Sequence, residues 1–349
     1  MKIELYDKLK LKVISRITLA GVGLGLLFIL LTRGFSQPFA LLNGAIAGAF
    51  IGFSVGVLEI YIFPRNAKRL KFIWYFLIRS ITYTVFLGFI LFNVTLVSQM
   101  FRFDETYFEV LRSDRFIDYL EFGSFGTELI YIMLLALTVN FTRLMSIKLG
   151  QGVLQDYVLG TYHRPVIEKK VFLFAKISNS EELTKKLGAL RYHSFLDRLY
   201  RDITAPVLRN HGIIHQYIED LIVITWNGKI DNNANRCIKL YKELEALIES
   251  KKEGYQKKYG FVPKFVAGAH CGTVITAEIG EIKTQIVYQG DTMNTSSRIL
   301  NKAIELKSSL LISDELYSFL IGNNLDVMPH RNVHLKGKEM PMDLIAINT

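Results

Sequence analysis

The stretch YQGDTMNTSSRI, residues 288 to 299, holds an asparagine and an arginine four residues apart. Residues at i and i+4 project from the same face of a helix, so Asn294 and Arg298 can act on one ligand together. A guanidinium carries a fixed fork of donors, which suits the neutralisation of negative charge. The alternative is a solvated helix face that happens to carry both residues.

A second stretch, VFLFAKISNSEEL, residues 171 to 183, places Lys176 at the end of a buried-strand pattern, where the chain turns towards a helix. Ser178 and Glu181 have the spacing of a capping box. A helix N-terminus there would offer free N–H groups to an anion. Phosphate binding and simple capping are equal alternatives at this turn.

The elements that would position these residues follow from the periodicity of the second half of the chain. The run IIHQYIEDLIVITW predicts two strands joined by a tight turn at Glu219 and Asp220, and KFVAGAHCG with TVITAEIG predicts another strand pair. The order strand, helix, strand, strand, helix, strand is that of a ferredoxin-like split βαβ unit with additions, in an α+β domain over 171–349. The remaining expected elements are strands at 171–177, QIVYQGD, 309–313, 332–336 and 342–347, and helices at about 180–210, about 232–257 and DTMNTSSRILNKAIE.

The first half of the chain reads as a membrane domain. A mean hydropathy of +0.25 with 50% hydrophobic residues is high for a purely soluble protein. A bilayer span takes roughly 20 apolar residues. Four stretches meet this length, at about 15–33, 38–63, 72–98 and 125–147, which predicts an all-α four-helix transmembrane domain over 1–148.

Basic residues predict the orientation of these spans. They cluster before the first span and in the second connection, whereas the third connection, 99–124, holds three arginines against six acids. Both termini and the second half of the chain are therefore expected on the cytoplasmic side. The basic residues concerned are Lys2, Lys8, Lys10, Lys12, Arg16, Arg65, Lys68, Arg69 and Lys71, with Arg143 and Lys148 at the exit of the fourth span.

Two features of the spans concern packing and charge. Gly44, Gly48, Gly52 and Gly56 recur every four residues, which predicts a helix-packing ridge or, in a sharper form, a dimerisation face. Glu59 and Arg79 fall near the cytoplasmic ends of their spans and could neutralise one another. A role in signal sensing is the alternative for such intramembrane charges.

Residues 149–170 form a short linker or transducer helix, in which Pro165 separates the exit helix from the first strand of the second half. A linker this tight would transmit movement better than a flexible tether. Cys237 and Cys271 are 34 residues apart without a CxxC motif, so a structural role is expected for both.

The second half resembles the class III nucleotide cyclase catalytic domain, and with four spans before it the chain looks like the membrane-bound bacterial adenylate/guanylate cyclases. The resemblance rests on the G-D-x-x-N-x-x-x-R pattern of Gly290, Asp291, Asn294 and Arg298. It implies that Asn294 orients the ribose and Arg298 neutralises the triphosphate in a partner chain's active site. It also implies triphosphate binding by Lys336 on a late strand, where a lysine acts as a point charge.

Two further positions are those at which the family selects the base. They are occupied by Gln216 and Val287, which match neither the adenine-selective nor the guanine-selective pattern. Gln216 can hydrogen-bond a base edge in either amide orientation, and Val287 can only pack. ATP is expected before GTP only because it is the family's commonest substrate.

The resemblance also implies two divalent ions, Mg²⁺ or Mn²⁺, held by two aspartates with hard oxygen ligands. One aspartate is present as Asp220, although the family's usual preceding glycine is Glu219. The other position is Lys176, and the backbone carbonyl of Ile177 is the remaining expected ligand. The metal site is thus expected to be weakened or absent.

Three functional alternatives arise from this departure. The chain is a cyclase subunit completed by a metal-competent partner chain, a catalytically inactive cyclase-like membrane receptor or regulatory subunit, or an active homodimer that uses Glu219 or another acid. The expected partners are a nucleoside triphosphate, the membrane and a second cyclase chain in a homodimer or heterodimer, with no nucleic acid. The expected location is the bacterial inner (plasma) membrane.

Overall fold

The computed structural model describes residues 2–33, 38–62, 71–320 and 325–348. The chain divides into two compact units, Met1–Met145 and Ser146–Thr349, and each is described by itself.

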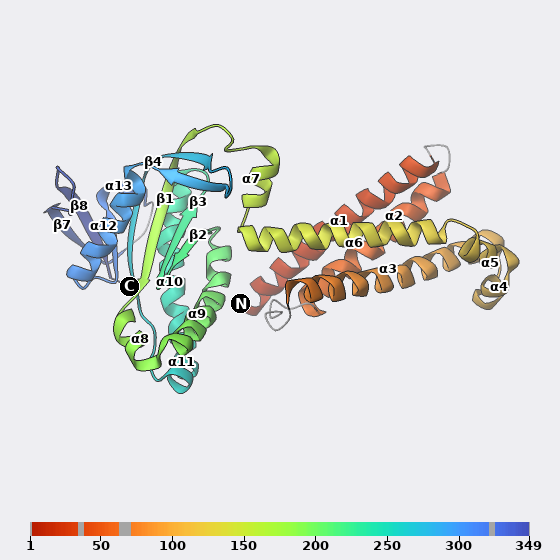
Figure 1. The fold of residues 1–349 in the computed structure, drawn as a ribbon, viewed down its shortest axis with the longest axis horizontal. Helices are drawn as coiled ribbons and strands as arrows, with labels where there is room; N and C mark the ends of the chain where they lie inside the picture. The colour runs from red at the N-terminus through yellow and green to blue at the C-terminus, as the bar shows by residue number, and fades with distance from the viewer. Residues whose placement is uncertain (1, 34–37, 63–70, 321–324, 349) are drawn as a thin grey trace. The chain divides into compact units, whose positions relative to one another are not determined.

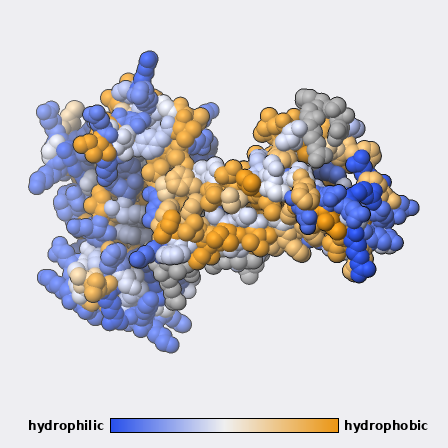
Figure 2. All heavy atoms as spheres, turned by 45° about the vertical axis from the view of Figure 1, so that its right-hand side comes forward, coloured by the Kyte–Doolittle hydropathy of each residue, from blue (hydrophilic) through white to orange (hydrophobic). Residues whose placement is uncertain are grey.

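The first unit consists of helices, four of which are long and apolar enough to cross a membrane. The candidate spans are Ile14–Thr32, Pro38–Tyr61, Phe72–Phe103 and Phe125–Leu149. Figure 2 shows hydrophobic residues over the visible surface of these helices, as expected of side chains that face lipid. The elements are α1 (Lys2–Arg33), α2 (Pro38–Val57), the π-helix η1 (Leu58–Ile62), α3 (Phe72–Phe103), α4 (Tyr107–Arg112), α5 (Asp114–Glu121) and α6 (Phe125–Leu149).

The orientation of the spans stays a prediction. The expected basic connection with Arg65, Lys68 and Arg69 and the end of the second span at 63 lie outside the described residues, as do the side chains of Lys2, Lys8, Lys10 and Lys12. The third connection forms the two short helices α4 and α5, the second of which is capped by the Ser113 hydroxyl.

The glycine ridge of α2 packs against α1 of the same chain. Gly44, Gly48, Gly52 and Gly56 are all buried. A Cβ on Gly52 would lie 2.6 Å from the carbonyl oxygen of Ile17, so only hydrogen fits between the two backbones. The packing interpretation is therefore confirmed. The dimerisation-face prediction is wrong for this ridge, because α1 already covers it.

The predicted pairing of Glu59 and Arg79 is confirmed, and two further residues contact Glu59. Glu59 forms ion pairs with Arg79 on α3 and with Arg143 on α6. The Tyr83 hydroxyl also donates to Glu59 Oε1 at 2.6 Å. One buried carboxylate on η1 thus links η1, α3 and α6 of the membrane unit.

The second unit is built on a mixed eight-stranded sheet in the order β2-β3-β1-β4-β6-β8-β7, with β5 paired to β4. The β4–β6 pairing is parallel and the others are antiparallel. The strands are β1 (Val166–Ile177), β2 (Ile213–Ile218), β3 (Leu221–Trp226), β4 (Phe265–Ile279), β5 (Gln285–Gln289), β6 (Leu310–Ser313), β7 (Val327–Val333) and β8 (Met342–Ile347).

Helices cover both faces of this sheet (Figure 1). The larger core lies between one face and helices α9 and α10, which contribute Phe195 and Tyr241 among others. On the other face α12 buries Ile299 and Leu300. The helices are α7 (Val153–Leu159), α8 (Ser180–Leu187), α9 (Ala189–Arg209), α10 (Ile230–Ser250), α11 (Lys252–Tyr259), α12 (Asp291–Glu305) and α13 (Asp314–Tyr317).

Several predicted boundaries were wrong. The expected helix over 180–210 breaks at Gly188, whose φ of 73° suits glycine, and the helix over 232–257 divides between α10 and α11. KFVAGAHCG and TVITAEIG form one continuous strand, β4, rather than a pair. Its glycines allow close approach rather than a turn, since a Cβ on Gly272 would lie 2.6 Å from Thr292 Oγ1 of α12.

The linker region also differs from the prediction. Strand β1 begins at Val166, so the last five residues assigned to the linker belong to the sheet. The linker helix α7 is only seven residues long. The backbone N–H of Glu278 donates to the carbonyl of Tyr162 at 2.9 Å, which attaches the linker to β4.

The α1–α2 packing generates a first prediction. Gly52→Ala should destabilise the membrane unit by about 1–3 kcal/mol, because the added methyl group meets the backbone of α1. Gly23→Ala is the matched control, since a Cβ there meets nothing within 4 Å. Thermal unfolding of the full chain in detergent, followed by circular dichroism, should show a lower melting temperature for Gly52→Ala alone. Equal melting temperatures for the two variants would contradict the packing.

Candidate functional site

Helix α12 carries the predicted partner-serving residues. It begins at Asp291, directly after Gly290, whose φ of 132° only glycine adopts readily. Asn294 is exposed one turn into the helix, and Arg298 follows half-buried on the same face. The guanidinium of Arg298 donates from Nη1 to the carbonyl oxygen of Gly337 at 2.8 Å, which fixes its orientation.

Lys336 lies in a turn rather than on a strand, which corrects its predicted placement. Strand β7 ends at Val333, and residues 334–341 form the connection to β8. The hydrogen bond from Arg298 to Gly337 brings this connection against α12. The structure therefore places Lys336, which is exposed, next to a residue that contacts Arg298.

The two base-selecting positions lie on strands β2 and β5. Gln216 pairs with Val223, whose side chain belongs to the core on the α12 face. Val287 pairs with Ala277 on β4. The rings of their neighbours His215 and Tyr288 lie 4.7 Å apart between centroids and are tilted by 55°, so the two strands are in contact here.

At the end of β1, Lys176 forms an ion pair with Asp220. Its Nζ lies 3.7 Å from Asp220 Oδ2. Asp220 is 7% exposed, whereas the Lys176 side chain is 37% exposed. The backbone N–H of Ile177 also donates to the carbonyl of Asp220 at 3.2 Å, so the strand end and the hairpin turn are joined. The predicted turn at Glu219 and Asp220 is confirmed.

The backbone at Glu219 is left-handed, with φ of 53°. A non-glycine residue there costs about 1–2 kcal/mol, which is the physical reason a glycine suits this turn. The Tyr200 hydroxyl donates to the Glu219 carbonyl at 2.8 Å and so helps to hold the strained turn. Burial, followed by the charge of Asp220, raises the pKa of Tyr200, which stays a neutral donor at physiological pH.

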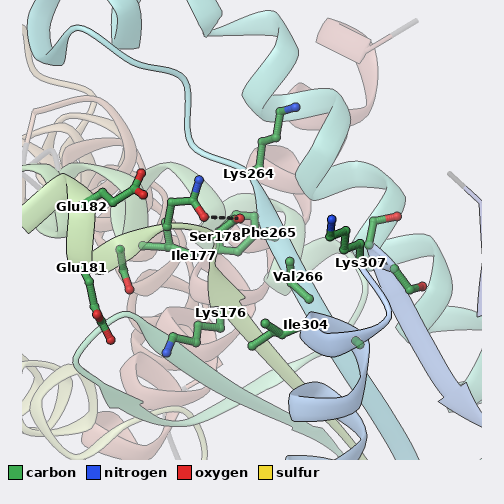
Figure 3. A pocket seen from close by; sticks show the side chains of 15 residues that line it. Lys176, Ile177, Ser178, Glu181, Glu182, Lys264, Phe265, Val266, Ile304 and Lys307 are labelled. Carbon is green, nitrogen blue, oxygen red and sulfur yellow. Dashed lines mark hydrogen bonds between the residues drawn. The ribbon is translucent and has the colours of Figure 1, made fainter.

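A cavity of about 650 Å³ opens beside Lys176. It is lined by the end of β1, the first turn of α8, the start of β4 and the C-terminal end of α12. Figure 3 shows Lys176, Lys264 and Lys307 around it, with their ammonium groups pointing in different directions. The three lysines therefore do not form one anion-binding cluster.

The predicted capping box next to this cavity is not formed. Helix α8 begins at Ser180, and its N-cap is Asn179 in a left-handed conformation without a side-chain cap hydrogen bond. The backbone N–H of Ser178 instead donates to the carbonyl of Lys264, the residue before β4, at 2.9 Å.

The residues at the strand end do not fit a two-cation site. Hard dications need several oxygen ligands with matching negative charge, and here a single carboxylate already faces an ammonium. Among residues 2–33, 38–62, 71–320 and 325–348, no three histidine, cysteine or acidic side chains come together as a metal site. Cys237 and Cys271 are buried and free, as expected for structural cysteines.

The two groups of predicted site residues lie at different ends of α12. The cavity beside Lys176 reaches Ala303 and Ile304, whereas Asn294 lies nine residues earlier. At a rise of about 1.5 Å per residue the separation along the helix is about 13 Å. The two groups of predicted site residues therefore adjoin different stretches of α12.

Sequence reasoning missed a polar cluster under the start of α12. Lys338 forms an ion pair with Asp291. His270 is buried nearby, with Nδ1 2.8 Å from Ser313 Oγ. Burial and then the charge of Lys338 lower the pKa of His270 to about 4, against an opposing effect of Asp291. Only tertiary packing reveals this cluster, since its members are far apart in sequence.

The pKa of His270 generates a second prediction. An unfolded histidine titrates near 6.5, so between pH 6.5 and 4 the unfolded chain binds more protons than the folded one. The stability of the second unit should fall by about 2 kcal/mol from pH 7 to 5, and His270→Gln should abolish this part of the loss. Urea unfolding of the full chain can be followed by Trp226 fluorescence in a Trp74→Phe background. The same pH dependence in both proteins would contradict the assignment.

Comparison with known proteins identifies the second unit. The profile of the adenylate and guanylate cyclase catalytic domain matches residues 165–347. Adenylate cyclase 2 of Rhizobium meliloti (strain 1021) is 35% identical over 188 residues, which are 54% of this chain and 52% of that protein. Guanylate cyclase beta of Plasmodium falciparum (isolate 3D7) is 37% identical over 71 residues, which are 20% of this chain and 2% of that protein.

A solved structure shows that the fold is shared. The structure of a bacterial light-regulated adenylyl cyclase superposes with a TM-score of 0.54 at 15% identity, covering 62% of this chain and 64% of that one. The segment of this chain that matches Adenylate cyclase 2 spans about half the length of that rhizobial relative. The profile match covers more than half of the chain, which therefore belongs to the family of adenylate and guanylate cyclase catalytic domains, with four candidate membrane helices before that domain.

Proposed function

We propose that the chain is a membrane-anchored subunit of a nucleotide cyclase that completes an active site with a metal-competent partner chain. The reaction is intramolecular. The 3′-oxygen of a nucleoside triphosphate bonds to the α-phosphorus, the bond to the bridging oxygen breaks, and diphosphate leaves. The 3′-hydroxyl proton passes to solvent or a base.

The observation that carries the proposal is the ion pair between Lys176 and Asp220. An ammonium supplies one positive charge where the family holds two dications, and it cannot bind the 3′-oxygen as a Lewis acid. Loss of several kcal/mol of such stabilisation lowers the rate by about 10³-fold. This chain's own half-site is therefore proposed to be catalytically silent.

The other half-site keeps the side chains that would serve a partner. Asn294 is exposed and would bind a ribose hydroxyl. Arg298 hydrogen-bonds Gly337, the residue after Lys336, so we expect both cations to face one triphosphate. Fixed cations aimed at developing negative charge are an efficient way to stabilise a transition state. ATP is the expected substrate, with the base selected at Gln216 and Val287. ATP is preferred only because it is the family's commonest substrate, and Gln216 and Val287 are assigned only from their positions in the family.

The four candidate spans support a multi-pass membrane location, with the catalytic unit proposed to be cytoplasmic. A membrane anchor suits a signalling role because α6 runs from the last candidate span into the second unit. A catalytically inactive receptor is the second candidate function. The ion pair of Lys176 and Asp220 is equally compatible with a chain that has no catalytic role.

A complementation assay tests the third prediction. Lys176→Asp should restore a metal site and give an active chain, whereas Lys176→Asp combined with Arg298→Ala should be inactive alone. Mixing this double variant with the wild-type chain should restore activity, because one composite site then has both halves. The assay measures cyclic AMP and cyclic GMP made by full chains in detergent with Mg²⁺ or Mn²⁺. Lys264→Asp, at a neighbouring lysine of the cavity, is the control and should stay inactive.

The other outcomes decide between the alternatives. Absence of activity in the mixture, despite dimerisation measured by light scattering, would overturn the proposal in favour of a non-catalytic role. Calorimetry with ATP would then separate a nucleotide receptor from a scaffold. Wild-type activity with Mn²⁺ that is lost in Asp220→Ala would instead support an active homodimer.

A further inference from the structure

The connection between β7 and β8 contains a tight turn that presents one exposed lysine. The backbone N–H of Lys338 donates to the carbonyl of Leu335 at 3.0 Å, which closes a four-residue turn. Gly337, at its third position, has φ of 74°. That angle is typical of a type II turn, which requires glycine there. Lys336 therefore stands at the second position, exposed to solvent.

Each of the other three residues of this turn is attached to α12. Leu335 is 3% exposed and packs in a core with Ile299 and Ala303. The carbonyl of Gly337 accepts the hydrogen bond from Arg298. Lys338 forms its ion pair with Asp291 at the first residue of the helix. The turn is thus fastened at three points that surround Lys336.

The ion pair has a built environment on the α12 side. The Thr295 hydroxyl donates to Asp291 Oδ2 at 3.1 Å, which orients the carboxylate. The hydrogen bond from Lys338 is the main cause that lowers the pKa of Asp291. Negative charge in the first turn also suits the helix dipole. The Asp291 carboxylate therefore has two partners in its own chain, Thr295 and Lys338.

We propose that Asp291 and Lys338 are positioning residues, which fasten the turn to α12 so that Lys336 and Arg298 present their charges to one triphosphate. The role of Asp291 in the Gly290–Asp291 motif is then to hold this turn rather than to contact substrate or metal. Arg298 would serve both purposes, because one of its five guanidinium N–H donors holds the turn at Gly337 and the others would bind the triphosphate. The inference rests on the proposed function for the identity of the ligand, but the fastening of the turn stands on geometry alone.

A double-mutant cycle tests the coupling. Asp291→Asn and Lys338→Met are introduced into the otherwise wild-type chain of the complementation mixture, which is the chain that keeps Arg298. Each should raise the KM for ATP about threefold, in line with the modest energy of an exposed ion pair. The double variant should be no worse than either single one, because both remove the same contact. Lys338→Arg should restore the wild-type KM. Lys302→Met is the matched control, since it removes a comparable pair with Glu305 on the same helix and should leave KM unchanged.

Hydrogen exchange of the full chain in detergent supplies a readout that does not need catalysis. Peptides covering residues 333–341 should exchange about threefold faster in Asp291→Asn and Lys338→Met than in the wild type or Lys302→Met. If the wild-type mixture makes no cyclic nucleotide, the proposed function fails while this measurement still decides whether the turn is fastened. Unchanged exchange in both variants would overturn the inference. Multiplying effects on KM would also overturn it, because Asp291 would then act on the substrate independently of Lys338.

Discussion

The proposed function depends on the ion pair of Lys176 and Asp220, and the register of β1 against β3 brings these two residues together. Strand β1 pairs with β3 so that Lys176 stands opposite Leu221, the residue directly after Asp220. A long side chain at this register position therefore reaches the carboxylate of the hairpin turn. Asp220 is nearly buried, and leaving it without a counter-charge would be costly. Lys176 supplies this counter-charge at 3.7 Å, although Asp220 Oδ2 has no hydrogen-bond partner among the described residues.

Different groups of predicted site residues lie near the two ends of helix α12. The N-terminal half carries Asn294 and Arg298, and the C-terminal end borders the cavity beside Lys176. Along the helix axis, Asn294 lies about 13 Å from Ala303, which borders the cavity. In the proposed composite site each half would come from a different chain. A departure at Lys176 would then be compatible with an intact Asn294 and Arg298.

The sequence predicted best where a local pattern determines the structure. The i, i+4 spacing of Asn294 and Arg298, the hairpin turn at Glu219 and the apolar lengths of the four spans all depend on nearby residues. Predictions failed where a distant partner decides the outcome. Gly272 resembles a turn residue in sequence, but it lies within β4 and allows the close packing of α12 on that strand. Lys336 lies in a turn because Leu335 packs into the core of α12 and strand β7 ends at Val333. The capping-box prediction failed for a similar reason, since the backbone N–H of Ser178 donates to the carbonyl of the distant residue Lys264.

The central claim is that Lys176 prevents metal binding beside Asp220. Measuring metal binding tests it most directly, because this measurement depends neither on dimerisation nor on turnover. Electron paramagnetic resonance can count Mn²⁺ bound to the full chain in detergent, for the wild type and for Lys176→Asp, at the same concentration of a non-cyclisable ATP analogue. The account predicts no tightly bound Mn²⁺ at the strand end of the wild type and recovery of binding in the variant that depends on Asp220. Two tightly bound Mn²⁺ ions per wild-type chain, lost in Asp220→Ala, would contradict it.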